Sequence, residues 1–369
     1  RTGDYGLGVV ISASHNPADD NGIKLLSHNG AKVPDAFERA IEELLEAGLP
    51  AGKTGTEMGA ITPAPDEVRG YLEFLESLVP ERLEGLTVVV DGSNGAGYEL
   101  GPEILHRLGA NLITLGVSPD GKNINTGCGA TRPHTLQAAT QQHNADLGVA
   151  FDGDADRAVF ADRHGRLTNG DRTMAIWARH WRPEPPVLVG TVMSNGGFEH
   201  YLEGAGMQLS RANVGDRNVA IRMRETGAKI GGEESGHIIF AERGPTGDGL
   251  VTALEILRVL KREGRDLAHF YDEFENWPQV LSNLRVANKD GWEQREPVRA
   301  AIQMAESQLG ESGRVSVRAS GTQPVLRVMV EASETGARDE THRALVSALL
   351  QELGGEVESE VDLTHALGA

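Results

Sequence analysis

Short apolar runs alternate with amphipathic segments between residues 86 and 151, and this alternation constrains the fold most. The expected strands are 86–91, 111–115 and 146–151, and the expected helices between them are 96–108 and 133–143. Consecutive strands joined by a helix pair in parallel, because the crossover returns the chain to the same end of the sheet. The segment therefore predicts an α/β unit with a parallel sheet, whose strand-to-helix loops gather at one edge.

The same alternation recurs further along the chain. At 369 residues the chain should divide into about two to four domains. We predict domains at 1–65, 66–167, 168–277 and 278–369. The fold class is then consecutive mixed or parallel-sheet α/β domains, the first one partial, followed by a C-terminal α+β domain.

A helix is expected near the start of the chain. Asp35 and Glu38 match a capping box, and Gly48 is suited to end the helix. Helical spacing places one set of apolar side chains on the inward face. These are Phe37, Ile41, Leu44 and Leu45.

An acidic loop follows the expected strand 146–151 directly. Its sequence Asp152-Gly153-Asp154-Ala155-Asp156-Arg157 places three carboxylates at alternate positions of one tight loop. Hard divalent cations such as Mg²⁺ prefer oxygen ligands of this kind. Three like charges after a buried strand also need a compensating cation, part of which Arg157 would supply. We predict a metal site at Asp152, Asp154 and Asp156; the alternative is a solvated acidic turn.

A second polar loop follows the apolar run Val9–Ile11, which we expect to be a buried strand. It contains Ser14, His15 and a turn-forming Asn-Pro pair, and Lys24 follows behind an Asn-Gly turn. A hydroxyl among donors and a cation suits covalent phosphate or acyl chemistry. Taken alone, a Ser-His pair is more often a turn or a cap.

Charge and composition disfavour several classes of partner. With 35 basic and 54 acidic residues the net charge is −19, which argues against a nucleic acid or an anionic membrane as partner. Cys128 is the single cysteine, and no apolar run approaches the ~20 residues of a membrane span. We therefore expect a cytoplasmic protein, a monomer or homodimer, that binds a small molecule.

Two more motifs complete a recognisable set: Gly232–His237 (GEESGH) and Arg318–Pro324 (RASGTQP). With Ser12–Pro17 (SASHNP) and Asp152–Arg157 (DGDADR), they stand in the order of the serine, metal, sugar and phosphate loops of the phosphohexose mutase superfamily. The chain resembles this superfamily over essentially its whole length. It is most similar to the phosphoglucosamine mutase branch, on the segments 123–131, 214–217 and 246–249.

The resemblance implies an isomerase acting on glucosamine 6-phosphate and glucosamine 1-phosphate, a step toward UDP-N-acetylglucosamine and cell-wall precursors. It implies a phosphorylated Ser14, a 1,6-bisphosphate intermediate, and one Mg²⁺ held by the three aspartates and the Ser14 phosphate. Arg157 and His15 would contact this phosphate. Lys24, with a lowered pKa, would be the general acid or base, and His237 would assist proton transfer or brace its loop.

Substrate contacts are implied in two places. Glu233 and Ser235 would bind the sugar hydroxyls. The substrate phosphate would be bound by Arg318, Ser320, Gly321, Thr322 and Arg327. For the 2-ammonium of the sugar we consider Asp216 or Asp248; the alternative is that both aspartates cap helices.

Other interpretations stay open from the sequence. One is a phosphoglucomutase or phosphomannomutase, and another is a phosphatase with an aspartate nucleophile. The serine loop lies late in the first domain of the family but near residue 14 here, so we also expect a truncated first domain. A non-catalytic, sugar-phosphate-binding fragment is the remaining alternative.

Overall fold

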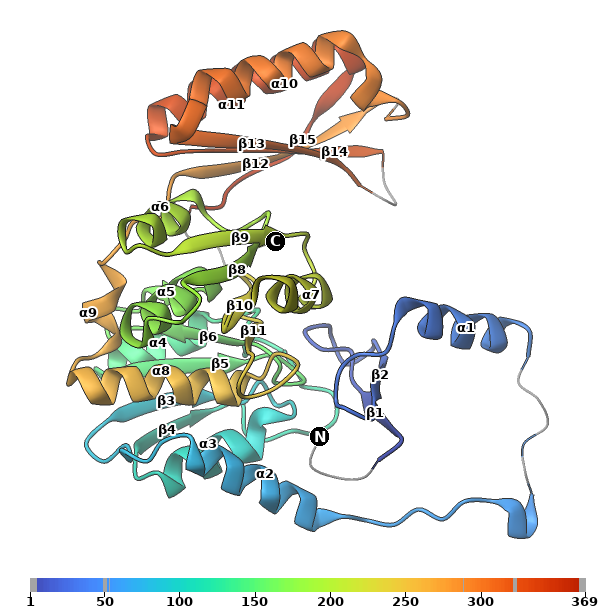
Figure 1. The fold of residues 1–369 in the computed structure, drawn as a ribbon, viewed down its shortest axis with the longest axis vertical. Helices are drawn as coiled ribbons and strands as arrows, with labels where there is room; N and C mark the ends of the chain where they lie inside the picture. The colour runs from blue at the N-terminus through green and yellow to red at the C-terminus, as the bar shows by residue number, and fades with distance from the viewer. Residues whose placement is uncertain (1–4, 49–51, 53, 288, 321–323, 365–369) are drawn as a thin grey trace.

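The computed structural model describes residues 5–48, 52, 54–287, 289–320 and 324–364. Four separate sheets follow one another along the chain, in mixed α/β units that stand side by side (Figure 1). The expected fold class is confirmed. The domain boundaries at residues 65, 167 and 277 stay a prediction.

The second unit contains the elements that the alternation predicts. Its strands are β3 (Thr87–Asp91), β4 (Asn111–Leu115), β5 (Leu147–Phe151), β6 (Ala158–Ala161) and β7 (Leu167–Thr168). Its helices are α2 (Pro65–Ser77), α3 (Gly97–Arg107) and α4 (His134–Gln142). The sheet order is β4-β3-β5-β6-β7, parallel for the first three strands and antiparallel for the last two. The sequence did not predict β6 or β7, which make the sheet mixed.

The third unit has the sheet order β11-β10-β8-β9. Its strands are β8 (Val187–Thr191), β9 (Gln208–Ala212), β10 (Ile230–Gly232) and β11 (Ile238–Phe240). Its helices are α5 (Gly170–Trp181), α6 (Gly196–Gly204), α7 (Asp216–Thr226), α8 (Gly249–Glu263) and the short α9 (Leu267–Tyr271).

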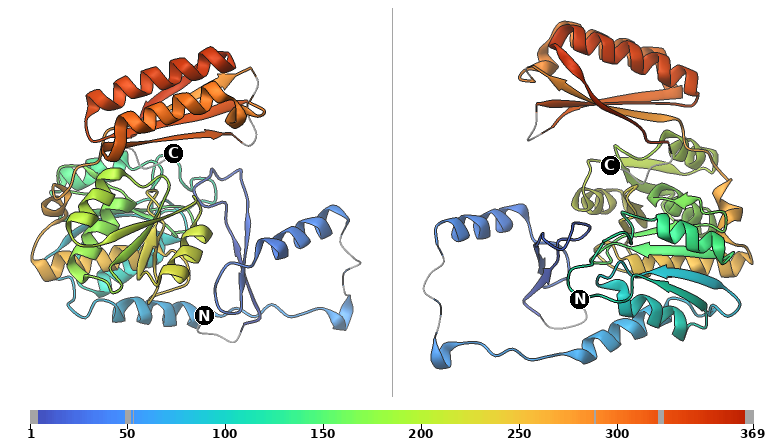
Figure 2. Two further views of the ribbon diagram at one scale, coloured as in Figure 1. Left: turned by 45° about the horizontal axis from the view of Figure 1, so that its top comes forward. Right: turned by 180° about the vertical axis from the view of Figure 1, so that it is seen from behind.

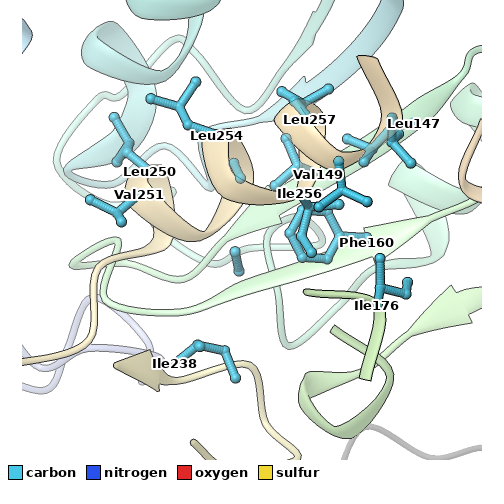
Figure 3. Close-up of a cluster of buried hydrophobic side chains, with 14 of the residues drawn as sticks. Leu147, Val149, Phe160, Ile176, Ile238, Leu250, Val251, Leu254, Ile256 and Leu257 are labelled. Atoms are coloured by element: carbon cyan, nitrogen blue, oxygen red, sulfur yellow. The ribbon is translucent and has the colours of Figure 1, made fainter. Parts of the chain in front are cut away.

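Helix α8 joins the second and third units through one core. Leu250, Leu254 and Leu257 are almost fully buried, and they belong to the same hydrophobic cluster as Leu147 and Phe160 of the second sheet. Figure 3 shows the helix lying along this cluster. Because the cluster also includes residues of the third sheet, the two sheets are held together by shared apolar burial.

The fourth unit has its own core. Its sheet order is β13-β14-β12-β15, formed by β12 (Gln279–Val286), β13 (Gly313–Ala319), β14 (Val325–Ala332) and β15 (Gly355–Asp362). Two 3₁₀ turns, η2 (Trp292–Gln294) and η3 (Gly310–Ser312), flank α10 (Glu296–Leu309), and α11 (Thr335–Leu353) follows β14. Both helices cover one face of the sheet, and the other face is turned toward the third unit (Figures 1 and 2).

The first unit differs from two expectations. It consists of β1 (Leu7–Ile11), β2 (Ile23–Ser27), α1 (Asp35–Glu46) and the 3₁₀ turn η1 (Gly55–Glu57). The expectation of a buried strand at Val9–Ile11 is wrong, because β1 pairs only with β2 among the described residues and Ile11 is 76% exposed. The predicted capping box is also wrong: Pro34 is the N-cap, and no side chain caps this end of α1.

Helix α1 forms where expected, but its apolar face is not inward. The side chains of Phe37, Ile41, Leu44 and Leu45 are exposed, and the helix stands away from the other units (Figure 2). Spacing alone predicts an apolar face and does not say whether other residues cover it. Among the described residues, no helix has the length and apolar character needed to cross a membrane.

Candidate active site

The metal loop lies immediately after β5, whose five residues are all buried. One carboxylate oxygen from each of Asp152, Asp154 and Asp156 lies within 4.8 Å of the others. Asp154 Oδ1 and Asp156 Oδ1 are buried and have no hydrogen-bond partner. Buried oxygens without partners are costly unless a cation or a donor satisfies them. The arrangement suits an ion with oxygen ligands.

Electrostatics in this loop follow from three close carboxylates. Burial, and then the charges of Asp156 and Asp154, raise the pKa of Asp152 to about 7. Burial also disfavours the charge of Asp156, but His237, Lys24 and Arg157 lower its pKa below the usual value. Crowding among the carboxylates thus opposes ionisation at Asp152, whereas the neighbouring cationic groups favour it at Asp156.

Ser14 lies against this loop although the two are far apart in sequence. Its Oγ donates a hydrogen bond to Asp152 Oδ2 at 2.9 Å, and its amide donates to Ser12 Oγ at 2.9 Å. Ser14 has a φ of 54°, in the left-handed region that non-glycine residues rarely adopt. Strain of this kind persists only where surrounding contacts maintain it.

The contacts that maintain the backbone of Ser14 come from the second unit. One of them, from Asn125, was not predicted from the sequence. Asn125 Nδ2 donates to the carbonyl oxygens of Ser14 (2.9 Å) and Asn16 (3.0 Å). Gly153 packs so closely that an added Cβ would lie 2.2 Å from Ser14 O. Asn125 falls in the segment 123–131 that carries the branch resemblance, but nothing in its spacing indicated a contact with residue 14.

Lys24, on β2, lies against the metal loop, where we expect a group that transfers protons. Its Nζ contacts Asp154 Oδ2 and lies 3.2 Å from Asp156 Oδ2. The lowered pKa expected for Lys24 depends on a neighbouring Mg²⁺ and stays a prediction, because the protein's own groups act in the opposite direction. Burial favours the neutral amine, but the two carboxylates outweigh it and raise the pKa of Lys24. Lys24 is therefore an ammonium at neutral pH here.

His237 is buried beside the same loop. Its Nδ1 lies 3.6 Å from Asp156 Oδ2, and its Nε2 accepts the Gly247 amide at 3.1 Å. Burial opposes the charged ring, yet Asp156 and Asp216 raise the pKa of His237. Because Nε2 accepts a backbone hydrogen bond, the ring nitrogen that carries the proton in the neutral form is Nδ1, which faces Asp156. This geometry fits bracing of the loop.

The sugar loop borders a cavity of about 370 Å³ between the second and third units. Glu233, Ser235, Arg157 and His15 line it. Glu233 Oε1 accepts the Gly215 amide at 2.8 Å, which fixes the carboxylate at the cavity wall. Ala130, Thr131 and Val214, from the segments that carry the branch resemblance, also line the cavity, as does Glu234 of the sugar loop. Thr191 and Met193 line it too, and the sequence did not single them out.

The phosphate arginines lie opposite each other on neighbouring strands. Arg318 on β13 pairs in register with Arg327 on β14, and both are exposed. Ser320 follows β13, and its amide donates to Val325 O at 2.8 Å. Gly321 and Thr322 lie outside the described residues. Two like charges opposite each other on a sheet are unfavourable, so the pair favours an anion between them.

The two candidate aspartates differ in role. Asp248 is the N-cap of α8: its side chain accepts the Val251 amide at 3.0 Å and the Tyr71 hydroxyl at 2.8 Å. Those contacts support the capping alternative for Asp248. Asp216 is the first residue of α7, not its cap, and pairs with Lys32 from the first unit.

Family models match nearly the whole chain, in the order of the four sheets. The models describe phosphoglucomutase/phosphomannomutase α/β/α domain I (residues 1–50), domain II (69–165), domain III (169–277) and the C-terminal domain (281–347). The chain belongs to the phosphoglucomutase/phosphomannomutase family.

Relatives within the family agree with the branch inferred from the sequence. Phosphoglucosamine mutase of Symbiobacterium thermophilum is 47% identical over 335 residues, which cover 89% of this chain and 74% of that protein. Phosphoglucosamine mutase of Desulforudis audaxviator is 44% identical over 373 residues, covering 99% and 81%. The resemblance to the superfamily, and within it to the phosphoglucosamine mutases, is confirmed.

Solved structures show the same fold. A phosphoglucomutase/phosphomannomutase family protein from Burkholderia thailandensis superposes with a TM-score of 0.78 at 24% identity, covering 96% of this chain and 78% of that one. N-acetylphosphoglucosamine mutase of Aspergillus fumigatus, solved with GlcNAc-6P and magnesium, has a TM-score of 0.69 at 19% identity, covering 93% and 88%.

Proposed function

We propose that this family member is a phosphoglucosamine mutase that moves a phosphoryl group between the 6- and 1-positions of glucosamine. The observation that carries the proposal is the Ser14 hydroxyl hydrogen-bonded to Asp152 in a three-carboxylate loop. That loop lies beside a cavity lined by Glu233 and Ser235. Relatives that are 43–47% identical and named phosphoglucosamine mutase support the choice of substrate.

Phospho-Ser14 is the proposed phosphoryl donor. The sugar hydroxyl attacks phosphorus, the bond to Ser14 Oγ breaks, and the hydroxyl proton finishes on the released Oγ, so that atoms and charge balance. Lys24 Nζ, held as an ammonium beside Asp154, is the proposed proton carrier. It would donate a proton to Ser14 Oγ as the bond to phosphorus breaks, and the resulting amine would take the proton of the attacking hydroxyl. Arg157 and His15, on the wall of the same cavity, would orient the phosphoryl oxygens.

A divalent cation fits the metal loop. Asp152, Asp154 and Asp156 would hold it, because their oxygens converge and two of these oxygens are buried without a partner. Mg²⁺ bound there would neutralise charge on the phosphoryl group during transfer. The magnesium in the Aspergillus fumigatus structure supports this choice of ion.

The far end of the substrate would be held by the fourth unit. Arg318 and Arg327 present adjacent guanidinium groups, which suit the phosphate that does not react. Transfer to the free hydroxyl gives a 1,6-bisphosphate. When this intermediate turns around in the cavity, its other phosphate faces Ser14 and can be transferred back to it. Glu233 and Ser235 would bind ring hydroxyls in both orientations.

A mutase assay tests the proposal. Turnover is measured with glucosamine 6-phosphate, glucose 6-phosphate and mannose 6-phosphate, in the presence of Mg²⁺ and a 1,6-bisphosphate primer. We expect the highest kcat/KM on glucosamine 6-phosphate and none in Ser14→Ala, whose intact mass should lack the phosphoryl group. Preference for a hexose phosphate would assign the chain to a phosphoglucomutase or phosphomannomutase activity instead. Activity retained in Ser14→Ala would reject the phosphoserine mechanism.

A further inference from the structure

A fully buried carboxylate connects the fourth unit to the third. Glu331 on β14 has no exposed surface. It accepts hydrogen bonds from Asn195 Nδ2 (3.0 Å) and the Gly196 amide (2.8 Å), at the start of α6 in the third unit. It also accepts from Gln279 Nε2 (2.9 Å) and Arg314 Nε (2.7 Å), on β12 and β13 of the fourth unit.

Arg314 extends the same connection. Its terminal nitrogens donate to the carbonyl oxygens of Val192 and Ser194, just after β8 of the third unit. Because Glu331 is fully buried, removing its charged partner would leave an uncompensated buried charge and destabilise the fold. We call Glu331 and Arg314 the latch, because each contacts both units.

The register of the sheet relates the latch to the phosphate arginines. On β13 and β14, Arg314 lies opposite Glu331, and Arg318 lies opposite Arg327. Residues 314 and 318 are an even number of positions apart, so both lie on one face of the strand. They are separated by about 13 Å at a rise of ~3.3 Å per residue. The same two strands thus carry the latch at one point and the phosphate arginines at another.

Met193 connects these features to the sugar cavity. It lies between the two carbonyls that Arg314 holds, and it lines the sugar cavity, as Glu233 does. Its sulfur also lies 3.2 Å from Arg318 Nη2. The segment held by the latch therefore contacts both the sugar cavity and one phosphate arginine.

We propose that Glu331 and Arg314 are positioning residues that fix the separation between the sugar cavity and the phosphate arginines. The inference rests on the proposed function, since it takes the sugar phosphate to contact both places at once. A ligand that spans two sites gains affinity from their fixed spacing. A ligand that occupies one site alone does not depend on that spacing.

Binding to the full chain tests the proposal without relying on turnover. Glucosamine 6-phosphate and inorganic phosphate are each titrated calorimetrically into the wild type and Glu331→Gln, a variant of equal size without the charge. We expect the affinity for glucosamine 6-phosphate to fall about tenfold or more, and that for inorganic phosphate to stay within about twofold. Equal losses for both ligands would reject positioning and indicate damage to the phosphate arginines, and no loss for either would reject it as well.

Glu255→Gln is the matched control. Glu255 is also buried and accepts from Trp177 Nε1 (3.0 Å) and Arg243 Nε (2.9 Å), within the third unit. It should lower thermal stability while the ratio of the two affinities stays unchanged. If Glu331→Gln does not fold, Arg314→Lys replaces it: the charge remains, but a single nitrogen cannot span Glu331 and two carbonyls. An unchanged ratio in that variant would contradict the proposal, whereas failure of the mutase assay alone would count only against the proposed function.

Discussion

The reactivity proposed for this molecule depends on where single atoms are held. Ser14 is held by its backbone: Asn125 binds its carbonyl oxygen, and Ser12 binds its amide. A short side chain on a fixed backbone has few positions for its hydroxyl. This explains how Ser14 Oγ meets Asp152 even though residues 14 and 152 belong to different units.

Metal binding can be tested at one aspartate. Mg²⁺ added to metal-free wild type should raise the melting temperature, because an ion that binds only the folded loop stabilises it, by about 2.7 kcal/mol at 100 times Kd. In Asp154→Asn this gain should fall by more than half, since one charged ligand is lost. Asp66→Asn, at an exposed position of α2, should keep the full gain. An equal gain in Asp154→Asn would show that the ion binds elsewhere.

At the scale of elements, the metal loop and the serine loop pack closely against each other at Gly153. Gly153→Ala would place a Cβ 2.2 Å from Ser14 O and 2.8 Å from Asn125 Nδ2. We expect kcat to fall by about a hundredfold or more, because a displacement of about 1 Å near reacting atoms has effects of this size. Gly204→Ala, where nothing lies within 4 Å, should leave kcat unchanged. Wild-type kcat in Gly153→Ala would mean that the serine loop moves freely.

A second contact between elements, at Glu81, should make the free energy of unfolding depend on pH. Glu81, after α2, pairs with Arg258 and Arg262 of α8. Burial disfavours its charge, but its backbone hydrogen bond and these two arginines lower the pKa of Glu81. Because folding lowers the pKa of Glu81, its ionised form stabilises the folded state at pH values above the unfolded pKa, near 4.5. This stabilisation is lost as the pH falls through the folded pKa. The stability difference between wild type and Glu81→Gln, about 1 kcal/mol at pH 7, should therefore vanish in acid. A difference that is constant with pH in urea unfolding would exclude this role.

Most of the strands and helices that were predicted from the sequence have regular apolar spacing, but β6, an apolar run of four buried residues, was missed because it is short. Strand β5 is an uninterrupted buried run, whereas all eight residues of β15 are exposed and alternate acidic with small or apolar side chains. Helix α7 buries only Val219 and Met223, too few for a visible stripe. The loops of the site were predicted because their residues are adjacent in sequence. Asn125 and Met193 were not, since their contacts depend on how separate units meet.

For the whole molecule, the proposed function has the substrate site draw on all four units, but these units are not joined in the same way. The second and third share one core, while the fourth has its own and meets the third through polar contacts. Substitutions at the proposed phosphate-binding side chains of the fourth unit should therefore change substrate affinity more than folding.

Arg318→Ala is the corresponding test. Loss of a charge-assisted bond to phosphate costs about 1.5–3 kcal/mol, so KM for glucosamine 6-phosphate should rise roughly ten- to a hundredfold. Arg318 is exposed, and the melting temperature should not change. Arg299→Ala, at an exposed site on α10 of the same unit, is the control. Unchanged KM in Arg318→Ala would remove this residue from the phosphate site.

The exposed segment that precedes α2, at the end of the first unit, has a consequence for where the polypeptide can be cut. Residues 54–64 are exposed throughout, with Ile61 at 99%, so a protease should cut there without disturbing either side. The two pieces would each carry half of the reaction centre, Ser14 and Lys24 on one and the aspartates on the other. Contacts such as Lys24 with Asp154 and Asn125 with Ser14 would have to reassemble them without a covalent tether. The two fragments would regain activity only as their concentration rises. The concentration at half-maximal activity would therefore measure the affinity between them.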